Sequence, residues 1–574
     1  MTGVSLESIK SSIFNKNPNL PTGSENSAQS NSEFSTWRGR FWPIHGHEYK
    51  KLLPLLLMLF LICFNYSVLR DMKDALVIQA SGSESIPYIK LWAVLPISVL
   101  FTLLFTKLSN RYSQEKVFYI MLSGFLLFFA LFGFVLLPFR DYLHPHKSAL
   151  ETILPGGKMA VRGLEFLLGL LVMFRYWTFT LIYVFAELWG SIVLSLLFWG
   201  FANEICTINE AKRFYPLLSI GANIALIISG LAMIGLSKLF GSDSWEQTLI
   251  LLQLALILAG LLGALIFFIY RYMQKNVLSD PLFYEPDLSK PKKKKSKLGI
   301  VESFKFLLKS KYLLCIAIIV IAYNLVINLI EVVYKNQIRL YYPSKGEDPL
   351  SYLVYTKGIE SAITGIAVII LLLSPMSNLI RRFGWTKTAL ITPIIILVTS
   401  LGFFGFLWYK NSLMETGSSF SSFKGLDSRK LPLLILEVFF GFLQVVLSKA
   451  FKYSVFDATK EMAFIPLDDE SRAKSKAAID GVGSRLGKSG GSLIHILLLM
   501  IFNTNSLSYA APFVALIILG IILIWIFSTR SLGRQFNELT EEGEELEISE
   551  ISKKKPKVSE LESLKEEKSV STLE

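Results

Sequence analysis

Long apolar runs dominate the chain between residues 51 and 530. Most are about 20 residues or longer, the length that an α-helix needs to cross the hydrocarbon core of a bilayer. The fourth run is long enough to hold a membrane span plus an interfacial or re-entrant segment. The pattern predicts about twelve spans, at 51–72, 90–109, 117–138, 168–203, 211–237, 246–271, 312–339, 352–374, 386–408, 431–458, 478–503 and 508–529.

A basic segment at 273–311, which contains SKPKKKKSK, divides these spans six and six. We therefore expect an all-α polytopic membrane protein of two six-helix bundles, 51–272 and 312–530, as in major-facilitator-like carriers. Ala211-Lys212 and Gly221 match Ala473-Lys474 and Gly483 at one constant offset, which supports a parallel repeat of the two halves. A polar tail at 1–50 and a charged tail at 531–574 flank the bundles.

Basic residues gather in alternate loops, so the net charge of +13 is mainly a topology signal. By the positive-inside rule, both termini and the basic linker face the cytoplasm. The Lys run indicates contact with water or anionic lipid, and a nucleic-acid partner is not expected. The first 50 residues lack the apolar core of a cleavable signal peptide. Cys63, Cys206 and Cys315 have no disulfide or metal-site spacing, and we expect no metal or cofactor.

Charges inside apolar runs are the most informative residues, because an ionisable group in the bilayer core is costly unless it meets partners or water. In the seventh span, Asn324, Asn328, Glu331 and Lys335 fall within about 60° of one another on a helix. This stripe predicts a cavity lined by these polar side chains. The alternative is a purely structural Glu331–Lys335 pair at i,i+4.

Further candidates lie in three other spans. Arg70 and Lys73 share a face with Tyr66 at the end of the first span, where Lys73 could instead mark the membrane interface. Glu187 stands between apolar stretches too long for a short carboxylate to reach water. A weaker polar stripe occupies the tenth span, with members Glu437, Gln444 and Ser448, near Lys449 and Lys452.

The segment GVGSRLGKSGGS at 481–492 resembles the end of a phosphate-binding P-loop, but Val482 stands where the loop needs glycine. As a helix, its glycines would form one packing side. The opposite side would carry two cations and two hydroxyls, a cradle for a polyanion. The alternative is helix packing with both cations at the membrane interface. The glycine side holds Gly483, Gly487, Gly490 and Gly491, and the polar side holds Arg485, Lys488, Ser489 and Ser492.

These residues indicate a carrier for an organic anion with more than one charge. The carboxylates leave three roles open, namely proton coupling, binding of cationic groups, and salt bridges that open and close with occupancy. Without a complete P-loop or a set of metal-binding carboxylates, nucleotide hydrolysis is not expected, and we predict a secondary active transporter rather than an enzyme.

Six ordered motifs within about residues 40–535 resemble the nucleotide transporters, or ATP:ADP translocases, of plastids and obligate intracellular bacteria such as chlamydiae and rickettsiae. This family is distinct from the mitochondrial carrier. The motifs are NYSVLRDMKDALVI, WTFTLIYVFAELWGSIVLSLLFWGFANEI, EAKRFYPL, NLIEVVYKNQ, FDATKEMAFIPLD and KAAIDGVGSRLGKSGG.

The resemblance implies that Lys73, Glu187, Glu331 and Lys488 are essential for transport. The sequence departs from the family pattern at three places, Arg175-Tyr176-Trp177, Val333-Tyr334 and His495-Ile496. These departures leave base specificity open, since members of the family differ in substrate.

The implied function is exchange of ATP for ADP, or of related ribonucleotides, by alternating access in the inner membrane of an intracellular bacterium. GTP, UTP, CTP and NAD are further candidate substrates. The alternative is proton-driven symport of nucleotides such as GTP, UTP or ATP, or NAD import. We expect a monomeric carrier in which Glu187 and Glu331 pair with cations when the site is empty. Arg70, Lys73, Arg485 and Lys488 would bind phosphates, and Tyr66 or Trp177 would stack on the base.

Overall fold

The computed structural model describes most of the apolar part of the chain. Parts of the tails and of several loops, including the predicted basic run at 290–297, lie outside the described residues. The described residues are 44–145, 164–239, 245–281, 283, 310–341, 349–373, 377–415, 430–467, 475–476, 479 and 483–554.

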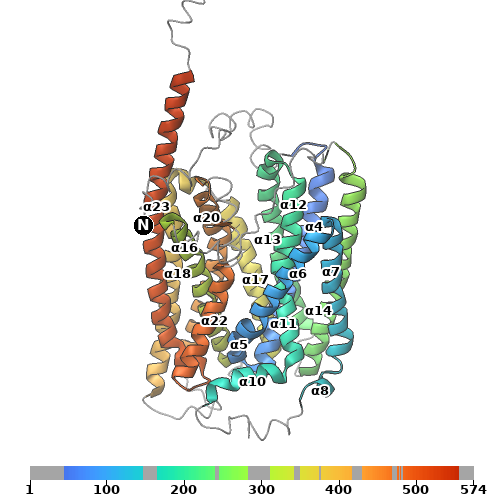
Figure 1. Ribbon diagram of the computed structural model, residues 1–574. Coiled ribbons are helices and arrows are strands. Elements are labelled where there is room, and N and C mark those ends of the chain that lie inside the picture. The colour runs from blue at the N-terminus through green and yellow to red at the C-terminus, as the bar shows by residue number, and fades with distance from the viewer. Residues whose placement is uncertain are drawn as a thin grey trace, which may run out of the picture.

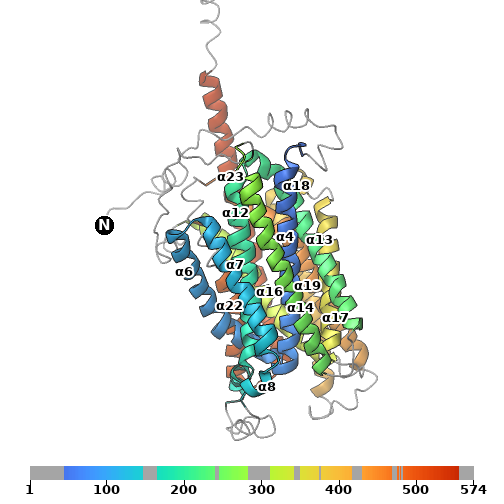
Figure 2. The ribbon, with the colours of Figure 1, turned by 90° about the vertical axis from the view of Figure 1, so that its right-hand side faces the viewer.

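The described residues fold almost entirely into helices that run side by side (Figure 1, Figure 2). Eleven of these helical stretches are long and apolar enough to cross a membrane. In the first half of the chain the main helices are α4 (Tyr49–Ser81), α5 (Ile86–Tyr88), η2 (Ile89–Val94), α6 (Leu95–Arg111), α7 (Gln114–Leu131), α10 (Leu168–Arg175), α11 (Trp177–Leu188), η6 (Trp189–Phe198), α12 (Trp199–Ile205), α13 (Ile208–Leu239) and α14 (Trp245–Tyr272).

The second half repeats this arrangement, and the all-α prediction is confirmed. Its main helices are α16 (Lys311–Tyr341), α17 (Pro349–Leu373), α18 (Ser377–Glu415), α19 (Lys430–Phe451), η9 (Lys452–Phe456), α20 (Asp457–Ala463), α22 (Ser484–Ile501) and α23 (Leu507–Lys554). Helix α22 is the predicted eleventh span. It is a membrane-length helix of 18 residues, but it is not among the eleven that meet the apolarity criterion.

The long fourth apolar run contains a break. Helix α10 ends at Arg175, and Tyr176 leaves helical geometry with φ −100° and ψ 47° before α11 begins. Helix α10 lies across the lower end of the molecule in Figure 1. The predicted extra segment is therefore a short helix that precedes the span Trp177–Ile205.

Local sequence explains where helices begin and end. Thr207 and Glu210 form a reciprocal capping box at the start of α13, because the backbone N–H of each meets a side-chain oxygen of the other. Gly82 ends α4 with φ +80°, a conformation in the region that favours glycine, and so turns the chain into the next span.

Packing within the first half is repeated in the second. Helix α4, the first span, packs against α11, α13 and α14, the fourth, fifth and sixth spans. Helix α16 correspondingly packs against α19, α22 and α23. This correspondence supports the parallel repeat that the sequence predicts.

The two halves meet at several contacts, among them the following two. Helix α13 packs along α17, and α22 packs against α5 and η2. At the first contact, a Cβ on Gly230 would lie 2.5 Å from the carbonyl oxygen of Gly358, and a Cβ on Gly358 would lie 2.7 Å from that of Gly230. The two backbones therefore touch where these glycines lie.

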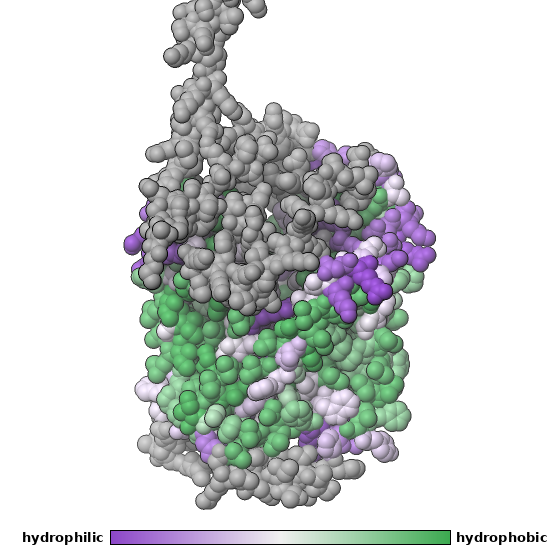
Figure 3. All heavy atoms as spheres, in the orientation of Figure 1, coloured by the Kyte–Doolittle hydropathy of each residue, from purple (hydrophilic) through white to green (hydrophobic). Residues whose placement is uncertain are grey.

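Both described ends of the helical body, the start of α4 and the end of α23, lie at the top of Figure 1, which we call the termini end. The opposite end we call the far end. On the face shown in Figure 3, hydrophobic residues form a broad band, bordered by hydrophilic residues above and below. Exposed side chains such as Leu127, Ile501 and Phe527 fit a surface that faces lipid.

The α13–α17 contact gives a first prediction. Gly230→Val is expected to destabilise the protein by about 1–3 kcal/mol, because the new side chain has no room beside Gly358 and Ala362. Gly235→Val on the same helix is the control, since a Cβ there meets nothing within 4 Å. Thermal unfolding in detergent checks both variants. Equal melting temperatures for the two would contradict the close contact.

Candidate functional site

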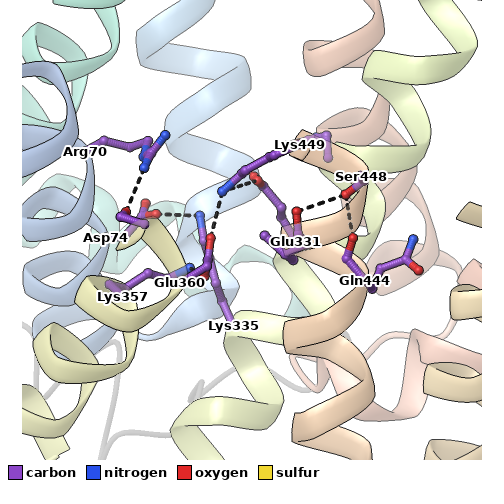
Figure 4. Close-up of polar contacts among 12 residues, drawn as sticks. Arg70, Asp74, Glu331, Lys335, Lys357, Glu360, Gln444, Ser448 and Lys449 are labelled. Carbon is purple, nitrogen blue, oxygen red and sulfur yellow. Dashed lines mark hydrogen bonds and ion pairs between the residues drawn. The ribbon is translucent and has the colours of Figure 1, made fainter. Parts of the chain in front are cut away.

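Asp74 joins the two halves through a buried ion pair. Its Oδ1 accepts a bond from Lys73 of the same helix at 2.8 Å, and its Oδ2 lies 2.7 Å from the ammonium of Lys335 on α16. All three side chains are at most 6% exposed. Figure 4 shows Asp74 and Lys335 pointing toward each other. The carboxylate therefore links α4 of the first half to α16 of the second.

Lys73 continues this chain of charges into the fourth span. Its ammonium lies 3.0 Å from Glu187 of α11 and 3.7 Å from the ring centroid of Tyr183. A buried lysine needs such partners, because desolvation of an isolated charge costs several kcal/mol. Helix α11 supplies both, since Tyr183 and Glu187 are four residues apart on one face.

A second chain of charges lies within the second half. Glu360 of α17 accepts bonds from Lys357 at 2.6 Å and from Lys449 of α19 at 2.7 Å. Lys449 also lies 3.7 Å from Glu331 of α16. Figure 4 shows these four side chains converging from three helices.

Arg70 and Asp71 form a second link between the halves. Arg70 lies 3.3 Å from Asp71, and its guanidinium also donates to the hydroxyl of Ser361 on α17 at 3.0 Å. Ser361 in turn donates to Asp71 at 2.6 Å. The hydroxyl of Ser361, in the second half, is thus hydrogen-bonded to both members of the Arg70–Asp71 ion pair in the first half.

Asn328 lies between two further lysines. Its amide oxygen accepts a bond from Lys90 of η2, and its amide nitrogen donates to the backbone carbonyl of Lys488 at 2.7 Å. The Lys488 side chain is exposed. The carboxylate of Glu187 feels the charge of both lysines.

These charged residues form one group between the halves, which we call the central charge cluster. Its cations are Arg70, Lys73, Lys90, Lys335, Lys357, Lys449 and Lys488, and its carboxylates are Asp71, Asp74, Glu187, Glu331 and Glu360.

Most predicted site residues belong to this region. The structure brings together Arg70, Lys73, Glu187, Asn328, Glu331 and Lys488.

The other predicted residues lie elsewhere. The amide nitrogen of Asn324 donates to the carbonyl of Val320 on its own helix. The Cβ of Asn324 packs against Gly487 of α22. Arg485 donates to Thr102 of α6 at 2.9 Å. Arg175 is the last residue of α10, the helix that crosses the far end in Figure 1, and it lies over the ring of Tyr176.

The two aromatic candidates differ as well. Tyr66 lies beside Arg70, with 5.7 Å from the guanidinium to the ring centroid, so it borders the cluster. The indole of Trp177 instead donates to the carbonyl of Leu143 near the far end. Trp177 thus has its described polar contact outside the cluster, and base stacking by either ring stays a prediction.

The structure decides against one alternative on α16 and corrects one predicted detail on α22. Glu331 and Lys335 form no ion pair with each other within the described part of the chain, because each meets a partner on another helix. Ser492 lies on the packing side of α22, where its hydroxyl meets Asn328. Gly490 meets nothing within 4 Å, whereas Gly487 and Gly491 are close to α16. The seam between α22 and α16 therefore uses two of the predicted glycines.

Sequence reasoning missed Asp71, Asp74, Lys90, Lys357 and Glu360. Lys357 and Glu360 stand within the eighth apolar run at i,i+3, a signal of the same kind as Glu187. Asp74 and Lys90 lie near span ends, where charges are ordinary, so only their tertiary contacts distinguish them.

A chain of polar contacts closes the far end across the two halves. Ser83 donates to Asn336 at 2.9 Å, and Arg339 lies 2.8 Å from Glu84. Asn336 and Gln337 both donate to Ser508 of α23. Gln337 also accepts from Lys410, which forms a buried 2.5 Å ion pair with Glu437.

No group of three or more His, Cys, Asp or Glu that could hold a metal occurs among the residues placed by the structure. The three cysteines are free. The chemistry available at the cluster is therefore charge recognition by ammonium, guanidinium and carboxylate groups.

Comparison with known proteins agrees with this chemistry. Residues 27–536 match the model of the TLC ATP/ADP transporter family. The chain belongs to this family. It is 45% identical to ADP,ATP carrier protein 1 of Chlamydia muridarum, over 88% of this chain and 92% of that protein.

Two more distant relatives of this TLC transporter cover similar lengths. ADP,ATP carrier protein 2, chloroplastic, of Arabidopsis thaliana is 42% identical over 87% of this chain and 76% of that protein. ADP,ATP carrier protein 1 of Rickettsia typhi is 38% identical over 90% of this chain and 99% of that protein. Among solved structures, a bacterial homologue of the iron transporter ferroportin in its inward-facing state gives a TM-score of 0.49 at 14% identity, covering 85% of this chain and all of that one.

The link between Asp74 and Lys335 gives a second prediction. Asp74→Asn leaves a buried ammonium with no carboxylate, so we expect a loss of about 3–5 kcal/mol in the free energy of unfolding. Adding Lys335→Met removes that unpaired charge, and the double variant is expected to be more stable than Asp74→Asn alone. Thermal unfolding of the three proteins in detergent measures this coupling. Additive losses would show that the two side chains do not interact.

Proposed function

We propose that this protein exchanges ATP for ADP across a membrane by alternating access, with the central charge cluster as its substrate site. The observation that carries the proposal is the composition and place of the cluster, in a member of an ATP/ADP transporter family. It lies between the two halves and is partly buried, and its cations outnumber its carboxylates, so it favours a polyanion. Lys73 and Lys488 bind phosphates, with Arg70 beside them.

The contacts between the halves support a carrier closed at the far end. There Ser83–Asn336 and Glu84–Arg339 cross from one half to the other. At the termini end, Lys51–Glu210 and Arg213–Glu48 instead join helices of one half. Exchange would proceed by rocking the bundles 51–272 and 312–530, which breaks the far-end contacts.

The orientation we propose follows the distribution of basic residues. The termini end carries basic side chains at several helix ends, and the positive-inside rule then places both termini in the cytoplasm. The described ones include Lys107, Arg111, Lys116, Arg271, Lys275 and Lys311. The membrane would be the inner membrane of an intracellular bacterium, since relatives include proteins of Chlamydia and Rickettsia.

The ion pairs also suit an obligatory exchange. When no substrate is bound, Glu187 holds Lys73 and Glu331 faces Lys449, so the cations are neutralised from within. Exchange of ATP⁴⁻ for ADP³⁻ moves one net charge per cycle, worth about 2.3 kcal/mol per 100 mV. An imposed membrane potential is therefore expected to change the exchange rate.

Uptake into liposomes tests the proposal. Vesicles that contain the purified protein are loaded with ADP or left empty, and labelled ATP is added outside. We expect uptake only into loaded vesicles. Uptake into empty vesicles driven by a pH gradient would indicate proton symport instead. The same assay with GTP, UTP, CTP and NAD defines the substrate range, and no nucleotide uptake at all would refute the function.

Replacement of Lys488 gives a third prediction. Lys488→Ala is expected to abolish ATP uptake, because a phosphate-binding charge is lost, and to leave the fold intact, because the side chain is exposed. Lys387→Ala, which removes an exposed lysine on α18, is the control. Size-exclusion profiles confirm folding. Near-normal uptake by Lys488→Ala would exclude its role in the substrate site.

A cross-link at the far end gives a fourth prediction. Ser83→Cys combined with Asn336→Cys places two thiols on side chains that now touch across the halves. Oxidation is expected to block exchange, because the far end can no longer open, and a reductant should restore it. Each single cysteine variant is the control. Unchanged exchange in the oxidised double variant, with the cross-link verified by mass spectrometry, would argue against opening at this contact.

A further inference from the structure

Lys90 is a cation of the central charge cluster that has no ion pair with any carboxylate that the structure describes. Its ammonium bonds the amide oxygen of Asn328, a neutral group. Glu187 and Glu331 act on it at longer range, and Lys335 and Lys73 repel it. By contrast, each carboxylate of the cluster forms an ion pair with a cluster cation other than Lys90.

The orientation of the Asn328 amide is fixed by its neighbours. Its nitrogen faces the carbonyl of Lys488, which only accepts, and its oxygen faces the Lys90 ammonium, which only donates. The nitrogen also donates to Ser492 at 3.1 Å. A flipped amide would set a donor against the Lys90 ammonium and an acceptor against the Lys488 carbonyl. The Asn328 amide therefore has one stable orientation.

Gly491 makes room for that arrangement. A Cβ at this position would lie 2.7 Å from the amide nitrogen of Asn328. Asn328 itself is 2% exposed. Lys90 is further positioned by η2, a stretch of wider π-helical turns of a kind that frequently marks functional sites.

Lys488 contributes a second cation to the cluster, from the other half. Its carbonyl is tied to Asn328, its side chain is exposed, and it makes no ion pair with the described residues. Lys90 and Lys488 both act on the carboxylate of Glu187. Two lysines from opposite halves thus contact one amide, Lys90 through its ammonium and Lys488 through its backbone carbonyl. Neither forms an ion pair with a carboxylate that the structure describes.

We propose that Lys90 is a substrate-binding residue that forms, with Lys488, a clip across the two halves for the polyphosphate chain of a nucleoside di- or triphosphate. Asn328 is its positioning residue. This assignment rests on the proposed function. A phosphate oxygen replaces the neutral amide oxygen at Lys90, so both donor and acceptor are then charged and the bond is stronger. Because the clip draws on both halves, the bound chain also holds them in one relative position.

Transport kinetics in ADP-loaded liposomes test the clip. Lys90→Gln is expected to raise the KM for ATP by about 10- to 100-fold, the effect of one lost bond to a charged group. It should also weaken inhibition of ATP uptake by tripolyphosphate, a phosphate chain without a nucleoside, by a similar factor. Lys90→Arg keeps the charge and should stay within about threefold of the wild type. Lys107→Gln removes an exposed lysine from the same span and is the matched control, with unchanged kinetics.

Asn328→Asp provides an independent variant that retains Lys90. Its carboxylate would neutralise Lys90 and compete with the phosphate chain, so tripolyphosphate inhibition should again weaken. If the wild type exchanges ATP but Lys90→Gln shows an unchanged KM and unchanged tripolyphosphate inhibition, the clip is overturned. The proposed exchange function would then still stand. Should Lys90→Gln fail to fold, undiminished inhibition of Asn328→Asp by tripolyphosphate would overturn the clip equally. Wild-type protein that exchanges ATP without being inhibited by tripolyphosphate would also count against it.

Discussion

Charges buried between two packed halves must find partners, and this requirement organises the structure. At the low dielectric of a protein interior, an unpaired ion costs several kcal/mol, so the carboxylates of the cluster each lie against an ammonium or guanidinium. Two contacts of these carboxylates cross the boundary between the halves. They are the Asp74–Lys335 ion pair and the hydrogen bond that Ser361 donates to Asp71. The charges of the proposed substrate site therefore also hold the two halves together.

The repeat in the fold explains how such a cluster forms. The first and seventh spans, α4 and α16, each lie at the centre of their own half, in contact with the fourth, fifth and sixth helices that follow. Charged residues on these two helices therefore face the boundary and meet partners from the outer helices. Three of the π-helical stretches, η2, η6 and η9, begin next to or a few residues after Lys90, Glu187 and Lys449. Locally widened turns thus accompany the residues that point inward.

The sequence alone predicts the all-α membrane fold and about half of the residues of the central charge cluster. Apolar runs predict the spans, and the polar stripe on the seventh span correctly selects Asn328 and Glu331 as inward-facing. Helical periodicity does not say which helix lies opposite, so it could not identify Lys449 and Asp74 as the partners of Glu331 and Lys335. The same limitation explains Lys90, whose importance depends on an amide 238 positions away.

Glycine on both sides of the α13–α17 contact has a mechanical consequence. The carbonyl of Gly358 reaches the position of a missing Cβ on Gly230, and the reverse holds on the other helix. Backbone atoms have no rotamers with which to relieve compression, so this contact resists sliding of one helix along the other while leaving a tilt about the contact point comparatively easy. It would therefore serve as a fulcrum, and its position along the membrane normal would decide how far each end opens for a given rotation.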